Sequence, residues 1–344
     1  MRGGGRVPFD CDVAIAGAGP AGSSAAIWCA RHGLHTILLE AQPFPRDRPG
    51  ESLHPGVEPL FEQLGVAAAV RAAGFHRYRG HWVSWAAPPR FDEFGSGAEG
   101  PWLGFQAWRA DLDAILLREA VSAGATLLQP CRVSAPILEN RRIAGVRYQS
   151  GEVHARFTID ATGGHWLQRR AGIAVRRVSR RLVASYGYRA GTSPEIGADP
   201  VLAGSPAGWT WTARLRPALY AWTRLDFARP DRRPPAVLDR LEAAGPVRCA
   251  DVTWRIAEGC AGEGYFAVGD AASVTDPAAS HGVLKALMSG ILAADLIART
   301  SRGTLTESAA AAAYRDWVRQ WFERDTRRLA ELYQALGQSA LRVR

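Results

Sequence analysis

The chain has 344 residues, 47% of them hydrophobic, which is enough apolar material for a full core in one or two domains. Its formal net charge of +9 comes almost entirely from arginine and suits an anionic cofactor, a carboxylate substrate or an acidic partner protein. The arginines are scattered without a nucleic-acid motif, and the five cysteines form neither a CxxC pair nor a metal-ligand cluster. We therefore expect no nucleic acid, no metal, no disulfide framework and a cytoplasmic location.

The first elements predict a β-α-β unit. Residues 1–8 lack the pattern of a secretory signal, and an apolar strand at 11–16 follows them directly. A helix rich in small residues at 21–32 and a strand at 35–40 complete the unit. Stretches rich in proline and glycine are expected to be loops; they are 43–55, 86–101 and 191–208.

The next segments are of two kinds. A helix at 109–123 leads into strands that we assign to the same domain as the β-α-β unit, at 126–129, 133–138, 142–148 and 153–160. Other segments alternate like antiparallel strands and carry most of the aromatic residues, which predicts a second sheet. These segments are 75–85, 183–189, 209–214, 219–227 and 247–256.

The last part of the chain is mainly helical. A strand at 265–268 precedes a loop, an apolar helix from His281 and a charged helix over about 307–336. The longest apolar run, 282–298, contains Lys285 and Asp295 and is too short to cross a bilayer comfortably. We therefore expect a buried helix and no stable membrane insertion.

A glycine motif directly follows the first strand and opens the first helix. Gly17 permits a tight turn, Gly19 lets backbone N–H groups approach a pyrophosphate, and Gly22 allows close packing of the helix on the strand. Glu40 ends the next strand, where a carboxylate accepts hydrogen bonds from ribose hydroxyls. The motif in this context predicts dinucleotide binding. The expected contacts in the turn are Gly17, Gly19, Pro20, Ala21 and Gly22.

Three further features resemble the glutathione-reductase-like flavoproteins, and this resemblance implies FAD rather than NAD. The run from Phe266 to Asp270 resembles their second FAD signature, whose aspartate meets the ribityl or pyrophosphate part of the cofactor. The run from Ile159 to Gly163 resembles the strand and turn that return near the pyrophosphate. Arg109 stands where these families place a flavin-contacting arginine, with a surface arginine at a helix N-terminus as the alternative.

Other runs narrow the resemblance; they are Pro45-Arg46, Pro49-Gly50-Glu51-Ser52-Leu53, Asp276-Pro277 and Ser280-His281-Gly282-Val283-Leu284-Lys285-Ala286-Leu287. They resemble the group that contains flavin-dependent tryptophan halogenases, geranylgeranyl-reductase-like proteins and flavin monooxygenases. Within this group, the likeness is greatest to the flavoproteins that hydroxylate a protein-bound tryptophan in cysteine tryptophylquinone maturation. The resemblance covers residues 11 to about 336.

This resemblance implies an α/β fold, with a Rossmann-like FAD-binding domain of three layers (β-β-α), an inserted antiparallel-sheet substrate domain and C-terminal helices. We expect a discontinuous FAD-binding domain at 8–74, 105–175 and 257–300. The substrate-binding domain is expected at 75–104 and 176–256, and the C-terminal helical segment at 301–344.

The implied cofactor contacts beyond the first glycine turn are Glu40, Arg46, Ser52, Arg109, Val133, Gly163, Gly269, Asp270, Pro277, Gly282 and Val283. The helix that starts near His281 would present its N-terminus to the flavin, where the helix dipole stabilises negative charge on the reduced ring. His281 is therefore a candidate catalytic residue, with a capping role as the alternative. His54 is a second candidate, with a purely structural role as its alternative. Trp211 shares a strand face with Trp209, which suits either an aromatic substrate or a hydrophobic core.

Several activities compete on this scaffold. Halogenases of the group carry a Trp-x-Trp-x-Ile-Pro motif and a lysine in the substrate tunnel. Here the motif reads Trp209-Thr-Trp211-Thr-Ala-Arg, and His81 takes the place of the lysine by rough register. The Tyr-x-Trp-x-Phe-Pro signature of geranylgeranyl-type reductases is also absent. A reductase or dehydrogenase of a small or isoprenoid substrate stays open, as does a flavin-binding maturation partner without catalytic activity.

We therefore favour an FAD-dependent monooxygenase that hydroxylates an electron-rich aromatic substrate through a flavin C4a-hydroperoxide. The substrate is expected to be indole-like or tryptophan-like, either a small molecule or bound to a peptide or carrier. Molecular oxygen is the co-substrate. NAD(P)H as a transient reductant, or a separate flavin reductase, supplies the electrons, because no second dinucleotide fingerprint is identified.

Overall fold

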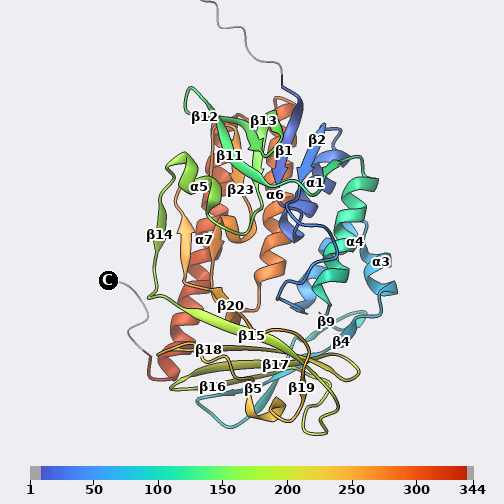
Figure 1. The fold of residues 1–344 in the computed structure, drawn as a ribbon, viewed down its shortest axis with the longest axis vertical. Helices are drawn as coiled ribbons and strands as arrows, with labels where there is room; N and C mark the ends of the chain where they lie inside the picture. The colour runs from blue at the N-terminus through green and yellow to red at the C-terminus, as the bar shows by residue number, and fades with distance from the viewer. Residues whose placement is uncertain (1–8, 339–344) are drawn as a thin grey trace, which may run out of the picture.

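The computed structural model describes residues 9–338. Residues 1–8, where no secretory signal is expected, and 339–344, the end of the expected C-terminal segment, lie outside the described part. The molecule has an upper α/β part and a lower, mainly antiparallel sheet, and the long helix α7 (Glu307–Ala335) runs beside both (Figure 1). The expected architecture, with a Rossmann-like part, an antiparallel sheet and C-terminal helices, is confirmed.

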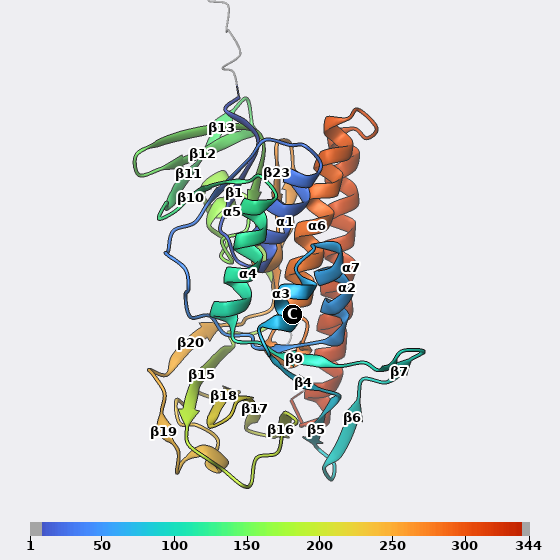
Figure 2. The same cartoon turned by 90° about the vertical axis from the view of Figure 1, so that its right-hand side faces the viewer.

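The upper sheet has a parallel centre. β1 (Cys11–Ala16) lies between β2 (Thr36–Leu39) and β13 (Gly151–Asp160), and β10 (Thr126–Leu128) and β23 (Tyr265–Ala267) extend the two sides. The first residues of β13 instead pair antiparallel with β12 (Arg142–Tyr148), which pairs with β11 (Val133–Glu139). Figure 2 shows this hairpin on one side of the parallel strands and the helices on the other, which gives three layers.

Alternation along β1 explains why both of its faces are buried. Val13 and Ile15 share one face and join the main core, whereas Ala14 on the other face packs in a separate cluster with Val146 and Val153 of the hairpin layer. On the helical side, α1 (Pro20–Arg31) packs against α4 (Arg109–Ser122) and α6 (Gly282–Ser301).

A glycine permits the close packing of α1 and α6. A Cβ atom at Gly290 of α6 would come within 2.2 Å of the Ala21 carbonyl oxygen of α1, so only glycine allows this approach. Within residues 9–338, no helix combines the length and apolar character that crossing a membrane requires.

The lower sheet has the strand order β19-β15-β18-β17-β16-β5-β6, and β20 also pairs with β15. Its long strands are β15 (Val183–Ala190), β17 (Gly208–Arg216) and β18 (Leu219–Asp226). The others are β5 (Gly80–Trp85), β6 (Arg90–Glu93), β16 (Val201–Ser205), β19 (Glu242–Ala243) and β20 (Arg248–Asp251). One face packs toward the upper part, and the opposite face buries Trp222 and Tyr220 against Leu238.

Several local expectations are wrong. The expected loop at 191–208 contains β16, and the one at 86–101 contains β6 and the hairpin of β7 (Ser96–Gly97) and β8 (Gly100–Pro101). The expected loop at 43–55 contains β3 (Ser52–Leu53). These strands are two to five residues long, so hydrogen bonds to distant partners define them and local periodicity does not.

Two expected strands are each divided. The segment 75–85 separates into β5 and β4 (His76–Tyr78), which pairs with β9 (Gly104–Gln106). The segment 247–256 separates into β20 and β21 (Arg255–Ala257), which lies between β14 (Val175–Arg177) and β24 (Ser273–Val274). The short helices α2 (Glu58–Gln63), α3 (Ala67–Ala72) and α5 (Trp166–Ala171) were not predicted, because one or two turns show little periodicity.

Candidate functional site

A cleft of about 750 Å³ separates the upper part from the lower sheet. The parallel strands β1, β2, β13 and β23 end at its upper wall, where the chain continues into Gly17, Glu40, Ala161 and Val268. The carboxyl ends of parallel strands meet at one edge of a sheet, and ligands of open α/β sheets bind there. The lower wall includes Trp209, Trp211 and His81.

The turn after β1 needs its glycines. Gly17 has φ +101°, and a Cβ atom there would come within 2.5 Å of the Ala161 carbonyl oxygen. Gly22 lies behind the cleft, where a Cβ atom would meet the Gly17 carbonyl oxygen at 1.8 Å. Gly17, Gly19, Pro20 and Ala21 line the cleft. No side chain caps the first turn of α1 at Gly19, so its N–H groups are available to an anion.

Glu40 and Arg46 stand beside this turn. Glu40 is buried, and its carboxylate accepts hydrogen bonds from the backbone N–H groups of Ala18 at 2.8 Å and Gln42 at 2.9 Å. The guanidinium of Arg46 lies 3.7 Å from Glu40 and 3.8 Å from Asp113. Burial lowers the pKa of Arg46, and its buried Nε has no hydrogen-bond partner among the described residues. A buried donor without an acceptor, at the rim of an uncapped helix, marks a place for an anionic group.

Arg109 lines the cleft, but the protein itself engages its guanidinium. Nε and one terminal nitrogen bind Asp113 at 2.9 and 3.1 Å, and the other terminal nitrogen donates to the Pro49 carbonyl at 2.6 Å. Arg109 therefore fixes the loop before β3. Because Arg109 is buried in this bidentate pair, the alternative of a surface arginine is wrong, whereas its contact with a flavin stays a prediction.

Glu51 is a buried carboxylate of the lining that sequence reasoning missed. It accepts hydrogen bonds from the Tyr188 hydroxyl at 2.5 Å and from the Gly50 N–H at 3.0 Å. Burial raises its pKa. Ser52, the next residue, donates to Gln106 at 2.8 Å and accepts from the indole N–H of Trp211 at 3.0 Å. This network joins the loop before β3 to the lower sheet.

The other predicted contacts lie along the same cleft. Val133, Gly163, Pro277, Gly282 and Val283 line it. Gly269 has φ +59° and donates its N–H to the Ser289 hydroxyl at 2.9 Å, and the side chain of Asp270 is exposed beside it. No side chain caps α6 at His281, so a second helix N-terminus is directed at the cleft.

His54 and His281 lie beside the cleft rather than in its lining, and their ring centroids are 5.6 Å apart. Burial lowers the pKa of both, to about 4 for His281, so His281 is neutral at pH 7. Its Nδ1 is 3.8 Å from the buried carboxylate of Asp325, which is not an ion pair in that state. His54 Nδ1 accepts the Gly56 N–H at 3.0 Å, so its Nε2 carries the hydrogen in the neutral ring.

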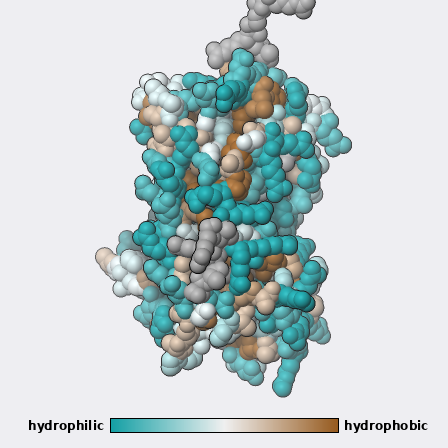
Figure 3. All heavy atoms as spheres, turned by 90° about the vertical axis from the view of Figure 1, so that its left-hand side faces the viewer, coloured by the Kyte–Doolittle hydropathy of each residue, from teal (hydrophilic) through white to brown (hydrophobic). Residues whose placement is uncertain are grey.

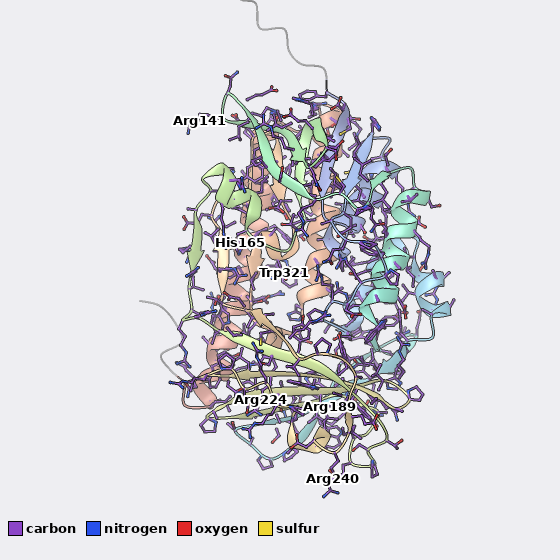
Figure 4. The ribbon with its side chains drawn as sticks, in the orientation of Figure 1. Arg141, His165, Arg189, Arg224, Arg240 and Trp321 are labelled. Carbon is purple, nitrogen blue, oxygen red and sulfur yellow. The ribbon has the colours of Figure 1, made fainter. Side chains whose placement is uncertain are left out.

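His81 is in the lining and belongs to a group of neighbouring rings with Trp211, Phe94 and His54, which we call the aromatic cluster. Its ring centroid lies 5.5 Å from that of Trp211 and 6.0 Å from that of Phe94, which in turn lies 5.3 Å from His54. Burial lowers the pKa of His81, and its Nδ1 has no hydrogen-bond partner within 9–338. On α7, Trp321, which is labelled in Figure 4, has its ring centroid 6.3 Å from that of His281.

Several other tryptophans lie away from the aromatic cluster. Trp82 and Trp102 are 45% and 54% exposed, and Trp222 lies on the opposite face of the lower sheet. Trp85 and Trp254 instead stack on Tyr333 of α7. Tyr333 was not predicted, because its place depends on the docking of a helix more than a hundred residues away from the sheet.

Lys285 is the only lysine of the chain. It lies in the first turns of α6, is 5% exposed and donates from Nζ to the Ser273 carbonyl at 3.2 Å. Burial lowers its pKa. The amine is therefore held by the protein beside the cofactor end of the cleft, and no lysine stands among His54, His81, Phe94 and Trp211.

Residues 10–188 match the family described as FAD binding domain. The chain is 27% identical to a tryptophan 2-halogenase from Chondromyces crocatus, over 96% of this chain and 69% of the relative. It is 28% identical to a 1H-pyrrole-2-carbonyl-[peptidyl-carrier protein] brominase from Pseudoalteromonas luteoviolacea, over 89% of this chain and 81% of the relative. Both named relatives are halogenases rather than tryptophan-hydroxylating maturation enzymes.

Solved structures agree with this assignment. The flavin-dependent halogenase CmlS superposes with a TM-score of 0.85 at 26% identity, over 96% of this chain and 65% of that one. A geranylgeranyl bacteriochlorophyll reductase-like protein from Thermoplasma acidophilum shares the fold, with a TM-score of 0.78 at 22% identity, over 96% of this chain and 87% of that one. The chain belongs to the FAD binding domain family and is an FAD-dependent oxidoreductase, similar in sequence to a tryptophan 2-halogenase and in fold to a geranylgeranyl bacteriochlorophyll reductase-like protein.

Proposed function

We propose that this protein is an FAD-dependent monooxygenase that hydroxylates an electron-rich aromatic ring, indole-like or tryptophan-like, in a small molecule or on a peptide or carrier. The observation that carries the proposal is the composition of the aromatic cluster at the lower wall of the cleft. It consists of aromatic rings and neutral histidines, whereas the only lysine of the chain is buried and bound to the Ser273 carbonyl. The cluster thus lacks the amine that the resemblance assigns to halogenases.

The cleft has the donors that FAD requires. The backbone N–H groups of Gly19 and Ala21 and the unpaired Nε of Arg46 suit a pyrophosphate, and Glu40 has free lone pairs for ribose hydroxyls. Asp270 suits the ribityl hydroxyls, and the N-terminus of α6 suits the ring end, where it would stabilise negative charge. When bound, FAD supplies two electrons to molecular oxygen and activates one oxygen atom for transfer.

The chain's own residues orient the substrate and manage protons. In the net reaction, the aromatic C–H becomes C–OH, the second oxygen atom leaves as water, and a reductant supplies two electrons. Trp211 and Phe94 form apolar walls that exclude water. Neutral His81 offers an unprotonated ring nitrogen to accept the proton that the hydroxylated ring carbon loses. His281 and His54 are the adjoining positions for a hydrogen bond to the substrate.

Halogenation is the second candidate, and the likeness to a tryptophan 2-halogenase over nearly the whole chain favours it. An assay with both oxygen and bromide present distinguishes hydroxylation from halogenation by the product that forms. The protein, loaded with FAD and supplied with NADPH or a flavin reductase, is incubated with tryptophan, indole, phenols and a tryptophan peptide under ¹⁸O₂ with bromide present.

Hydroxylation predicts one ¹⁸O atom in the product and no dependence on bromide. A brominated product would overturn the proposal in favour of halogenation. A product formed equally well without oxygen would instead identify a reductase or dehydrogenase. Protein that stays colourless with added FAD would contradict the cofactor assignment itself.

A further inference from the structure

A second cavity, of about 600 Å³, opens next to the cleft on the side of the molecule where β14 lies. Its lining residues are Arg177, Ser179, Arg180, Arg181, Asp251 and Thr253. Asp251 also belongs to the lining of the cleft, so the two cavities adjoin. Figure 3 faces this side and shows hydrophilic side chains across its middle. We call this cavity the arginine pocket.

Two chain segments that bond to each other build the frame of the arginine pocket. The N–H of Leu182 donates to the Thr253 hydroxyl at 3.1 Å, and the N–H of Trp254 donates to the Ser179 hydroxyl at 3.0 Å. The backbone N–H of Val178 donates to the Trp254 carbonyl at 2.9 Å, and the backbone N–H of Val252 donates to the Leu182 carbonyl at 3.0 Å. The frame places three exposed arginines close together, at the end of β14 and in the segment that leads to β15.

The guanidinium groups of these arginines have few partners within the described chain. The side chains of Arg177 and Arg181 make no hydrogen bond or ion pair with any residue of 9–338, and the guanidinium of Arg180 donates to Gln338 at 3.3 Å and lies 5.8 Å from the centroid of the Phe227 ring. The one acid in the lining, Asp251, is engaged by the guanidinium of Arg255 at 3.2 Å and by the Thr253 N–H at 3.0 Å. The pocket therefore has a net positive charge.

Burial and the positive charge of the arginine pocket together lower the pKa of two neighbouring side chains. Arg255 contacts His165 at the upper border of the pocket, and the pKa of His165 is lowered to about 4 by burial and by the charges of Arg255 and Arg177. The pKa of Arg255 itself is lowered, by burial first and also by Arg177. An anionic ligand would relieve this repulsion, and guanidinium groups bind phosphate oxygens in a bidentate manner.

We propose that the arginine pocket binds the 2′-phosphate end of NADPH and so delivers the nicotinamide to the flavin end of the adjoining cleft. This inference rests on the proposed function, because hydroxylation consumes two electrons that the substrate does not supply. The fingerprint at Gly17 to Gly22 serves FAD. Residues 95–100 repeat its glycine spacing, but they form the β7–β8 hairpin with no helix after it.

Charge and size support this occupant. A cavity of about 600 Å³ is within the usual range for nucleotide-sized ligands, about 300–1,000 Å³. A phosphate monoester carries most of two negative charges at pH 7, which matches three arginines better than the uncharged ribose hydroxyl of NADH does. In the reaction, nicotinamide loses a hydride to the flavin and becomes oxidised, and one solvent proton completes the two-electron reduction.

The test uses the FAD-loaded protein and two readouts. Calorimetry measures binding of 2′,5′-ADP, 5′-AMP and inorganic phosphate, and anaerobic mixing measures the rate of flavin reduction by NADPH and NADH as each is varied. The variant carries Arg177→Ala and Arg181→Ala together. The matched control is Arg240→Ala, which removes an exposed arginine at the lower tip of the molecule, away from His165 (Figure 4).

We expect the double variant to bind 2′,5′-ADP and NADPH about 10- to 100-fold more weakly, as the loss of charge-assisted hydrogen bonds predicts, with the limiting reduction rate unchanged. The control should match the parent protein, and NADH should be a weaker reductant throughout. Equal affinity for 2′,5′-ADP in parent and double variant would overturn the inference. Inorganic phosphate that binds as tightly as 2′,5′-ADP would also overturn the inference, because this result indicates a general anion site. The binding readout does not involve the aromatic substrate, so it stands even if the hydroxylation test fails.

Discussion

The hydroxyl group of Tyr333, near the end of α7, donates a hydrogen bond to the buried carboxylate of Asp276, in the loop that precedes α6. The same hydroxyl oxygen accepts the indole N–H of Trp209 at 2.8 Å, and the indole N–H of Trp254 donates to Asp276 at 3.3 Å. Through this network the helix α7 connects the loop before α6 with the lower sheet. The helix therefore helps to hold the two walls of the cleft in place.

Replacing Tyr333 by phenylalanine should destabilise the protein. The change leaves the Trp209 N–H without an acceptor and removes a donor from Asp276, both in the interior. We expect a loss of about 1–3 kcal/mol in the free energy of unfolding, measured by denaturant titration. Tyr148→Phe on β12 is the control, because its hydroxyl has no hydrogen bond within the described residues. Equal effects of the two changes would show that the Tyr333 network does not contribute to stability.

Asp276 should make stability depend on pH. Burial raises its pKa from 3.8 to about 6, so the folded state binds the proton more tightly than the unfolded state does. The resulting stabilisation is fully present below pH 3.8 and is lost as the pH rises through 6. The loss of unfolding free energy between these two pH limits is at most about 3 kcal/mol.

The measurement compares the unfolding free energies of the parent protein and Asp276→Asn between pH 4 and 8. The parent should lose stability relative to the variant as the pH rises. His281, whose pKa is lowered to about 4, acts in the opposite direction, but it contributes equally to both proteins and cancels. A difference that does not change with pH would contradict the raised pKa of Asp276.

The glycine turn gives a prediction about FAD retention. Gly22→Ala places a methyl group where the Gly17 carbonyl oxygen lies, so α1 must move away from the turn. We expect the purified variant to lose bound FAD, measured as visible absorbance per mole of protein. Gly197→Ala is the matched control, because a Cβ atom there meets nothing within 4 Å. Undiminished FAD content in Gly22→Ala would show that the turn tolerates this shift.

His81 gives a prediction about the proton acceptor. His81→Gln keeps a polar side chain but removes the base, and we expect the hydroxylation rate to fall about 10- to 100-fold with flavin reduction by NADPH unaffected. Stopped-flow reduction and product analysis measure the two steps separately. The control is His35→Gln, an exposed histidine after α1. A hydroxylation rate that survives the His81 change would remove this residue from the proposed mechanism.

The long elements were predictable because their patterns are local. The apolar run of β1, the small-residue helix α1 and the charged helix α7 each bury a face that repeats at the period of the element, and their predicted bounds agree with the structure to within one or two residues. The glycine turn was predictable for the same reason, because a strand, a tight turn and a helix follow one another directly.

The site itself depends on contacts between distant residues. Trp211 and Ser52 are 159 positions apart, and Glu51 and Tyr188 are 137 apart, so no local pattern reveals either pair. The arginine pocket likewise arises because β14 and β20 are brought together beside the cleft, although each arginine alone has the character of an ordinary surface residue. Sequence by itself therefore determined a dinucleotide-binding β-α-β unit, because that unit follows from short-range geometry, and the resemblance of its motifs to known flavoproteins implied FAD and the fold class. Only the tertiary structure decided which side chains meet across the cleft, because those meetings depend on how separate elements pack.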